Sequence, residues 1–310
     1  MKIGIARETG AEEKRVILRP QELVNVARKH ETLVEKGAGK GIGISDSEYE
    51  KVKVRVADMP EVYACDIVVR IKEPKEEELR LMRPGAYLMS MLHLPGNPKL
   101  RKLLKKYKVS AIPMEEIKNE FDERMIEALH QTGYIAMNKG FELWGADPRQ
   151  CLVKIMGYGK VAWGAIRAAA RKLVRKLEVL NKKDIYEMEK HIPGTDILVN
   201  GIRWPMGKRG KVLLIKRKML KLFKPGAIIL DLIANPEGQS PIETLKPGTL
   251  DNFSYKVDGV LHVSCWGWPG LDPVGISRRY SIQVAPILLE IADRGLDNLP
   301  EYIKSVAVKP

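Results

Sequence analysis

The chain has 310 residues, of which 45% are hydrophobic and 30% are charged. This length predicts about two domains, and this balance supplies enough apolar surface for folded cores. Its apolar runs, such as residues 227–230, are too short to span a membrane. Three widely spaced cysteines, Cys65, Cys151 and Cys265, suit buried thiols in a reducing cytoplasm better than a disulfide framework.

The net charge is +14, from 53 Lys and Arg against 39 Asp and Glu. Such a surplus suits nucleic acid, acidic membranes or anionic small ligands. The basic residues are mixed with Leu, Val and Met, no nucleic-acid motif accompanies them, and aromatic residues make up only 6%. We therefore expect a solvated basic surface and small anionic ligands, with neither nucleic acid nor a membrane as partner.

The first part of the chain alternates strands and helices. The pattern predicts strands over 2–6, 31–34, 66–71, 86–91 and 109–113, and helices over 20–30 and 98–107. A helix start is predicted at Ser45, because Asp46 and Glu48 follow it as early acids. Alternating β and α units predict a largely parallel sheet that helices cover.

The rest of the chain predicts a second α/β unit. One or two helices are expected over 119–145, then a linker at 145–148, then strands over 152–156, 177–180, 197–199, 227–230 and 261–263. A last helix over 277–293 carries a long apolar face, including Ile282, that needs a partner. We expect it to return to the first domain. The expected domains are 1–125 plus 277–310 for substrate and catalysis, and 126–276 for a dinucleotide.

A glycine motif follows the strand 152–156 directly. Gly157 and Gly159 precede Lys160, Val161 and Ala162, and helical sequence continues from there. In this strand–turn–helix setting Gly157 allows the tight turn, Gly159 lets the backbone approach a pyrophosphate, and Ala162 packs helix on strand. The helix N-terminus adds its positive dipole end. The motif predicts a Rossmann-type dinucleotide site.

The next strand bears on the choice of cofactor. An acid after it would bond the adenosine ribose, but here Asn181, Lys182 and Lys183 follow. Lysines attract a 2′-phosphate, so the sequence favours NADP. NAD stays open, because Glu178 could restore that preference if it turned inward, and both lysines could simply be solvated.

Several ordered blocks resemble the family of alanine dehydrogenase and pyridine nucleotide transhydrogenase. The most telling are Arg70-Ile71-Lys72-Glu73-Pro74 and Met91-Leu92-His93-Leu94. The others are residues 3–9, 13–16, 35–41, 45–49, 257–262 and 286–293. In its compactness, and in residues 157–165 and 196–202 that include Asn200 and Gly201, the chain is more similar to carboxyethylornithine synthase, which joins an amino acid to a 2-oxo acid with NADPH.

The resemblance assigns roles to single residues. It makes Arg15 a carboxylate clamp, Lys72 a substrate-binding lysine and His93 the proton donor during reduction, types of group that suit those tasks. Asn181, Lys182, Asn200 and Gly201 would contact the cofactor with the glycine motif. Asn235 stands where the relatives carry an aspartate; Asn cannot ionise, but as a candidate catalytic residue it can still bond the cofactor ribose or the substrate. Glu237 could substitute in part.

Two further features enter the expectation. Trp266 and Trp268 stand where the relatives carry a small polar stretch, so they could reshape the substrate pocket or pack between domains. The cysteines and histidines lack metal-ligand spacing, so no metal site is expected.

The sequence therefore predicts two Rossmann-like α/β domains joined by helices, in a cytoplasmic, homo-oligomeric oxidoreductase. It would act on the C–N bond of an amino acid with NADP or NAD, by reductive amination of a 2-oxo acid or reductive condensation with an amino acid. The alternative is a catalytically silent NAD(P)-binding protein or a transhydrogenase-like subunit. The enzymatic interpretation requires Arg15, Lys72 and His93 to converge.

Overall fold

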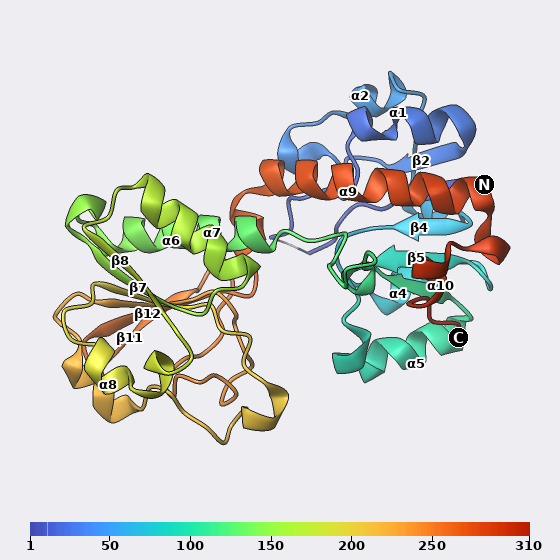
Figure 1. Ribbon diagram of the computed structural model, residues 1–310. Helices are drawn as coiled ribbons and strands as arrows, with labels where there is room; N and C mark the ends of the chain where they lie inside the picture. The colour runs from blue at the N-terminus through green and yellow to red at the C-terminus, as the bar shows by residue number, and fades with distance from the viewer. Residues whose placement is uncertain (11) are drawn as a thin grey trace. The chain divides into compact units, whose positions relative to one another are not determined.

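The computed structural model describes residues 1–10 and 12–310. It divides into two compact units, Met1–Glu127 with Pro273–Pro310 (unit 1) and Ala128–Asp272 (unit 2), and each contains one six-stranded sheet (Figure 1). The expected fold class, two α/β Rossmann-like domains built on mostly parallel sheets, is confirmed.

The sheet of unit 1 is parallel throughout and has the order β3-β2-β1-β4-β5-β6. Its strands are β1 Lys2–Ile5, β2 Glu31–Glu35, β3 Arg55–Ala57, β4 Ile67–Val69, β5 Tyr87–Ser90 and β6 Ser110–Pro113. Its helices are α1 Pro20–Lys29, α2 Asp46–Glu50, α3 Met59–Tyr63, α4 Glu76–Leu79, α5 Pro98–Tyr107, α9 Pro273–Arg294 and α10 Glu301–Lys304. The carboxyl ends of the parallel strands share one edge, where ligands bind in open α/β sheets.

Helix α9 closes unit 1 although it comes from the end of the chain. It packs against α1 (Figure 1), which covers the apolar face of the predicted last helix. Two buried serines of α9 also hold the loop between β1 and α1: Ser277 Oγ accepts the Val16 amide at 3.0 Å and Ser281 Oγ the Arg19 amide at 2.8 Å. The segment that directly follows Arg15 is therefore bonded to α9 at two points.

The sheet of unit 2 has the order β11-β12-β10-β9-β7-β8 and is parallel except at the edge strand β11. Its strands are β7 Leu152–Met156, β8 Lys176–Leu180, β9 Ile197–Asn200, β10 Ile228–Asp231, β11 Ser254–Val257 and β12 Val260–Ser264. Helices α6 Leu129–Trp144 and α7 Lys160–Arg171 cover one face, and α8 Met188–His191 lies over the other (Figure 1).

Helices α6 and α7 approach unusually closely because glycines face each other's backbone. A Cβ added to Gly133 would lie 1.8 Å from the Val161 carbonyl oxygen, and one added to Gly164 would lie 1.9 Å from that of His130. Only hydrogen fits in either place. This contact fixes the position of α7, which begins at the glycine motif.

The structure corrects several expectations from the sequence. Residues 119–128 are not helical: the Asn119 side chain accepts the amides of Phe121 and Glu123 and closes a turn instead. Residues 145–148, expected as a linker, connect α6 to β7 inside unit 2. The last helix begins at Pro273, and its Ile282 is 52% exposed rather than part of the buried face. Strands β3 and β11 were not predicted.

Among the residues that the structure describes, no helix combines the length and apolar character that crossing a membrane requires.

Candidate active site

Three predicted residues follow three neighbouring strands of unit 1. Arg15 lies in the loop after β1, Lys72 comes just after β4, and His93 comes just after β5. Because β1, β4 and β5 are adjacent and parallel, all three residues lie at one edge of one sheet. Sequence alone does not show this adjacency, since 78 positions separate Arg15 from His93 (93 − 15).

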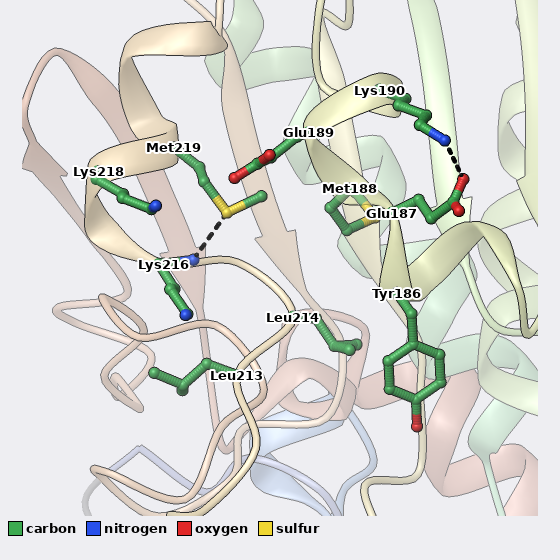
Figure 2. Close-up of a pocket in the computed structure, with 10 residues that line it drawn as sticks. All are labelled: Tyr186, Glu187, Met188, Glu189, Lys190, Leu213, Leu214, Lys216, Lys218 and Met219. Carbon is green, nitrogen blue, oxygen red and sulfur yellow. Dashed lines mark hydrogen bonds and ion pairs between the residues drawn. The ribbon is translucent and has the colours of Figure 1, made fainter.

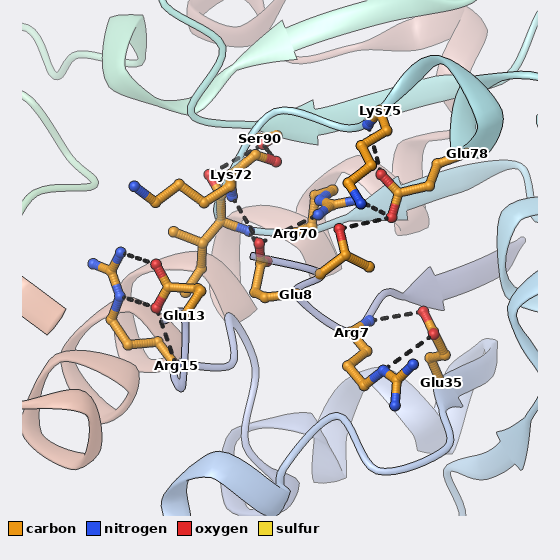
Figure 3. A network of polar contacts seen from close by, with 12 residues as sticks. Arg7, Glu8, Glu13, Arg15, Glu35, Arg70, Lys72, Lys75, Glu78 and Ser90 are labelled. Atoms are coloured by element: carbon orange, nitrogen blue, oxygen red, sulfur yellow. Dashed lines mark hydrogen bonds and ion pairs between the residues drawn. The ribbon is translucent and has the colours of Figure 1, made fainter. Parts of the chain in front are cut away.

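Arg15 is held by a carboxylate that the sequence did not single out. Glu13 accepts hydrogen bonds from Arg15 Nε at 2.6 Å and from Nη2, and both side chains are buried (Figure 3). Burial raises the pKa of Glu13, but the bonds to Arg15 and the positive charges of Arg15 and Lys72 outweigh it, so that pKa lies below the ordinary value. Two cations therefore act on one carboxylate here.

His93 sits in a left-handed backbone conformation with φ of 45°. Buried Glu115, which follows β6, accepts the His93 amide at 2.5 Å and the Leu92 amide at 3.1 Å. The same carboxylate lies 3.6 Å from His93 Nδ1, while the imidazole is 75% exposed. Glu115 thus supports a conformation that residues other than glycine rarely adopt, and leaves the imidazole accessible. The only sequence signal for Glu115 is its place after a neighbouring strand.

In unit 2 the glycine motif forms a tight turn between β7 and α7. Gly157 has a φ of +100°, and a Cβ there would lie 2.9 Å from the Gly201 carbonyl oxygen. Gly159 precedes the first turn of α7, which contains Lys160, Val161 and buried Ala162, and open space surrounds the position where a Gly159 Cβ would be. A backbone turn with open space at a helix N-terminus fits a pyrophosphate group.

The turn after β8 is closed by its own side chains. Asn181 Oδ1 accepts the Lys183 and Asp184 amides, and the Asp184 carboxylate accepts the Asn181 amide at 2.8 Å. Lys182 and Lys183 are exposed. Glu178 lies in mid-strand, 3.1 Å from Lys154 on β7, and pairs also with Lys176. Its carboxylate is therefore engaged along the sheet.

A buried carboxylate that the sequence did not reveal joins three strands of unit 2. Asp231, at the end of β10, accepts the Asn200 amide nitrogen at 2.8 Å and the Ser264 hydroxyl at 2.9 Å, from the ends of β9 and β12. Burial raises its pKa, and these bonds, with the amides of Ile233 and Ala234, oppose that rise. Asn200, expected to contact a cofactor, donates its amide nitrogen to Asp231.

Asn235 follows this cluster. The Asp231 carboxylate bonds the Ala234 amide at 3.0 Å, and Ala234 has a φ of 51°, so the chain turns sharply just before Asn235. Asn235 is 4% exposed, and its amide nitrogen has no partner in the structure. Buried donors are rarely left unpaired, and ligand sites are one place where they are.

The two tryptophans and Glu237, which the sequence also singled out, have different environments. Trp268 is buried and its Nε1 donates to the Asp231 carbonyl at 3.0 Å, whereas Trp266 is 59% exposed. Glu237 is exposed and lies 3.6 Å from Lys246. Trp268 therefore supports the end of β10, and the two indoles have different environments.

A separate pocket of unit 2 contains none of the predicted residues (Figure 2). Tyr186, Lys216, Lys218 and Met219 are among the residues that line it, together with Glu187, which pairs with Lys190. Because charges of both signs line this pocket, its electrostatics favour no class of ligand.

Comparison with known proteins defines the family. Two models, described as the N-terminal and C-terminal domains of alanine dehydrogenase/PNT, match residues 4–136 and 172–307. The chain belongs to the alanine dehydrogenase/PNT family. The glycine motif lies between the two matched ranges.

Relatives in this family match nearly the whole chain. Alanine dehydrogenase of Methanococcus maripaludis is 27% identical, with 95% of this chain and 88% of the relative covered. That of Geobacillus stearothermophilus is 26% identical, with 99% and 92% covered. The expected class is thereby confirmed at the level of the family: an oxidoreductase of amino acids that uses a nicotinamide cofactor.

Solved structures support the same fold. An L-alanine dehydrogenase superposes with a TM-score of 0.87 at 22% identity, covering 100% of this chain and 95% of that one. A transhydrogenase from Sinorhizobium meliloti gives a TM-score of 0.84 at 20% identity, covering 100% and 97%. Across residues 1–10 and 12–310, no group of three His, Cys, Asp or Glu side chains is arranged to hold a metal ion.

Proposed function

We propose that this protein catalyses the NADP-linked reductive amination of a 2-oxo acid, or its reductive condensation with an amino acid, and the reverse reaction. Forward, the 2-oxo acid, an amine, the reduced cofactor and one proton become the amino acid, water and the oxidised cofactor. The observation that carries the proposal is the placement of Arg15, Lys72 and His93 after three adjacent parallel strands, in a chain of this family.

Arg15 and Lys72 would hold the substrate carboxylate. A guanidinium binds a carboxylate through two parallel hydrogen bonds, and an ammonium adds a mobile point charge. Both already act on the Glu13 carboxylate and lower its pKa, which supports a role for them in binding a group of this kind. The substrate carboxylate then binds beside Glu13 or in its place.

His93 would move the proton. An exposed imidazole can donate to the substrate oxygen that leaves as water, and in the reverse direction accept a proton from the attacking water. The Leu92 and His93 amides donate to Glu115, and these bonds support the left-handed conformation of His93.

The cofactor would lie at the edge of the unit 2 sheet. The turn with Gly157 and Gly159 and the first turn of α7, from Lys160 to Ala162, would hold the pyrophosphate, and Gly201 borders that turn. When bound, the nicotinamide ring supplies or accepts the hydride. Asn200 donates its amide nitrogen to Asp231, so it would affect the cofactor site through that carboxylate.

Charge supports NADP over NAD. The turn held by Asn181 presents the exposed Lys182 and Lys183, whose ammonium groups attract a 2′-phosphate. Glu178, the acid that would favour NAD, is paired with Lys154 and Lys176.

Asn235 would bind as a neutral group. Its unpaired amide nitrogen can donate to an oxygen of the cofactor or the substrate, but it cannot take up a proton as an aspartate would. The reaction proposed here therefore relies on His93 alone for proton transfer at the substrate.

Oxidation of NADPH, followed by its absorbance, tests the proposal. Pyruvate, glyoxylate and 2-oxoglutarate are each paired with ammonia, ornithine and lysine, and NADH is compared in parallel. We expect turnover in at least one pairing, faster with NADPH. His93→Gln should reduce kcat by about 100-fold or more, whereas His30→Gln, which alters a surface contact with Asp293, should not. Absence of turnover in every pairing contradicts the proposal.

A nucleotide-binding protein without catalysis is the second candidate, and Asn235 in place of the aspartate of the relatives favours it. This candidate predicts that NADPH raises the melting temperature while no pairing turns over. We further propose that the protein works in the cytoplasm, which the three buried free cysteines support, and that it forms a homo-oligomer.

A further inference from the structure

Lys72 is anchored to the protein through its backbone on both sides (Figure 3). Its amide donates to Glu8 at 3.2 Å, and the amide of Ile71 donates to the other oxygen of Glu8 at 2.6 Å. From the opposite side, Ser90 Oγ lies 2.7 Å from the Lys72 carbonyl and 3.1 Å from that of Ile71. Ser90 on β5 and Glu8 in the loop after β1 thus hold three consecutive peptide groups, from the one before Ile71 to the one after Lys72.

Glu8 is itself held in place. Arg70 Nη2 lies 3.4 Å from its carboxylate, while Arg70 Nη1 bonds the Tyr63 hydroxyl at 2.5 Å and Glu78 at 2.9 Å. All four side chains are buried. A carboxylate with bonds to two amides and one guanidinium cannot rotate freely, so the peptide groups it accepts from are confined as well.

Burying the Glu8 carboxylate costs free energy, which favours a functional role for this network. Burial raises the pKa of Glu8, and Arg70 with the Ile71 and Lys72 amides opposes that rise. A buried charged network rarely stabilises a fold more than a packed apolar core would. Here it is built around the one segment that carries Lys72.

We propose that Glu8 and Ser90 are positioning residues that fix the Lys72 backbone, so that the ammonium meets the substrate carboxylate in one place. The inference rests on the proposed function, in which Lys72 binds that carboxylate. A lysine side chain is flexible along its length, so its root is the part that the protein can fix. A displacement of about 1 Å at a substrate-binding group can cost about 100-fold in rate.

Ser90→Ala tests the proposal with the smallest change. It removes one hydroxyl and leaves the Lys72 side chain intact. We expect KM for the 2-oxo acid to rise about tenfold, because a tenfold change corresponds to the loss of roughly one hydrogen bond. The dissociation constant for NADPH, whose expected site is in unit 2, should stay unchanged.

Thr32→Val is the matched control. Thr32 is buried in β2 of the same sheet, and its hydroxyl donates to the His30 carbonyl at 3.1 Å. The variant removes a comparable bond on a strand that does not neighbour β4, the strand before Lys72, so KM should not change. Glu8→Gln is the second variant: it keeps the shape of the side chain but sets an amide donor against one backbone amide, and it should raise KM in the same direction.

A double-mutant cycle separates positioning from general structure. In a Lys72→Ala background, Ser90→Ala should raise KM no further, because the group that it positions is gone. A full tenfold effect that persists without Lys72, or a wild-type KM in Ser90→Ala, would overturn the inference. Failure of the proposed function looks different, since the wild-type protein would then neither turn over any pairing nor be stabilised by any 2-oxo acid on heating.

Discussion

Gly159→Ala should separate cofactor binding from folding. Nothing lies within 4 Å of the position that the added methyl group would occupy. The backbone there has a φ of −78° and a ψ of 177°, which any residue adopts. The folded protein therefore accommodates alanine at this position without a clash. A bound pyrophosphate is the group that the added methyl group would contact.

The expected size of each effect follows from these facts. Alanine lowers the entropy of the unfolded chain, which stabilises the fold by about 0.4–1 kcal/mol. It is also a poorer N-cap than glycine, which destabilises the fold by a similar amount. The free energy of unfolding should therefore change by about 1 kcal/mol or less. A phosphate pushed from the backbone loses a hydrogen bond worth about 1.5–3 kcal/mol, because one partner is charged. NADPH should then bind about 10- to 100-fold more weakly.

The neighbouring glycine provides the contrast. Gly157→Ala places a methyl group 2.9 Å from the Gly201 carbonyl oxygen at a φ of +100°. Strain and overpacking together should cost about 2–4 kcal/mol of unfolding free energy, and NADPH binding should fall with it.

Two measurements decide the matter: urea unfolding for stability, and the fluorescence of bound NADPH for affinity. We expect Gly159→Ala to be as stable as the wild type and to bind NADPH poorly. Wild-type affinity in this variant would show that no phosphate approaches the turn, and the assignment of the dinucleotide site would be wrong.

Three further outcomes are expected. Asn235→Asp should weaken NADPH or substrate binding about tenfold, since it replaces the unpaired buried donor with an acceptor; higher activity in this variant would show instead that an acid is what the position requires. Buried His262 bonds Thr244 and the Val260 carbonyl, and burial lowers its pKa below the usual 6.5, so the folded protein should lose stability as pH falls below about 6.5, by up to about 1.4 kcal/mol per pH unit. Urea unfolding at pH 7.5 and pH 5 should show this loss, and His262→Gln should reduce it; equal pH dependence in both proteins would refute the assignment. Gly164→Ala should cost about 1–3 kcal/mol of unfolding free energy, because its methyl group would lie 1.9 Å from the His130 carbonyl, and a variant as stable as the wild type would contradict that packing.

The local pattern predicted most elements well. The helix expected over 98–107 is α5, with Pro98 at its start, and the helix start expected at Ser45 is present, where the Glu48 carboxylate accepts the Ser45 amide. These features depend on neighbours in sequence, through proline geometry and side-chain bonds to nearby amides. The helix predicted over 119–128 is wrong, and the cause is again local. Apolar spacing suggested a helix, but the Asn119 side chain accepts nearby backbone amides and closes a turn.

The candidate site was predicted unevenly. Arg15, Lys72 and His93 stood out because a family resemblance marked them, and the glycine motif because its chemistry is local. Glu13, Glu115 and Asp231 did not, although the side chain of each is buried against a predicted residue or next to one. A single acid in a sequence carries no sign of its partner.

The sequence by itself therefore determined the alternation of strands and helices, the turn at Gly157 and the types of charged group available. Only the tertiary structure decided which strands are neighbours, and hence that Glu8 and Ser90 meet at Lys72 and that Asn200 and Ser264 meet at Asp231. The physical reason is range. Helix, turn and cap preferences act over a few residues, whereas a buried carboxylate takes its donors from whichever strands pack beside it.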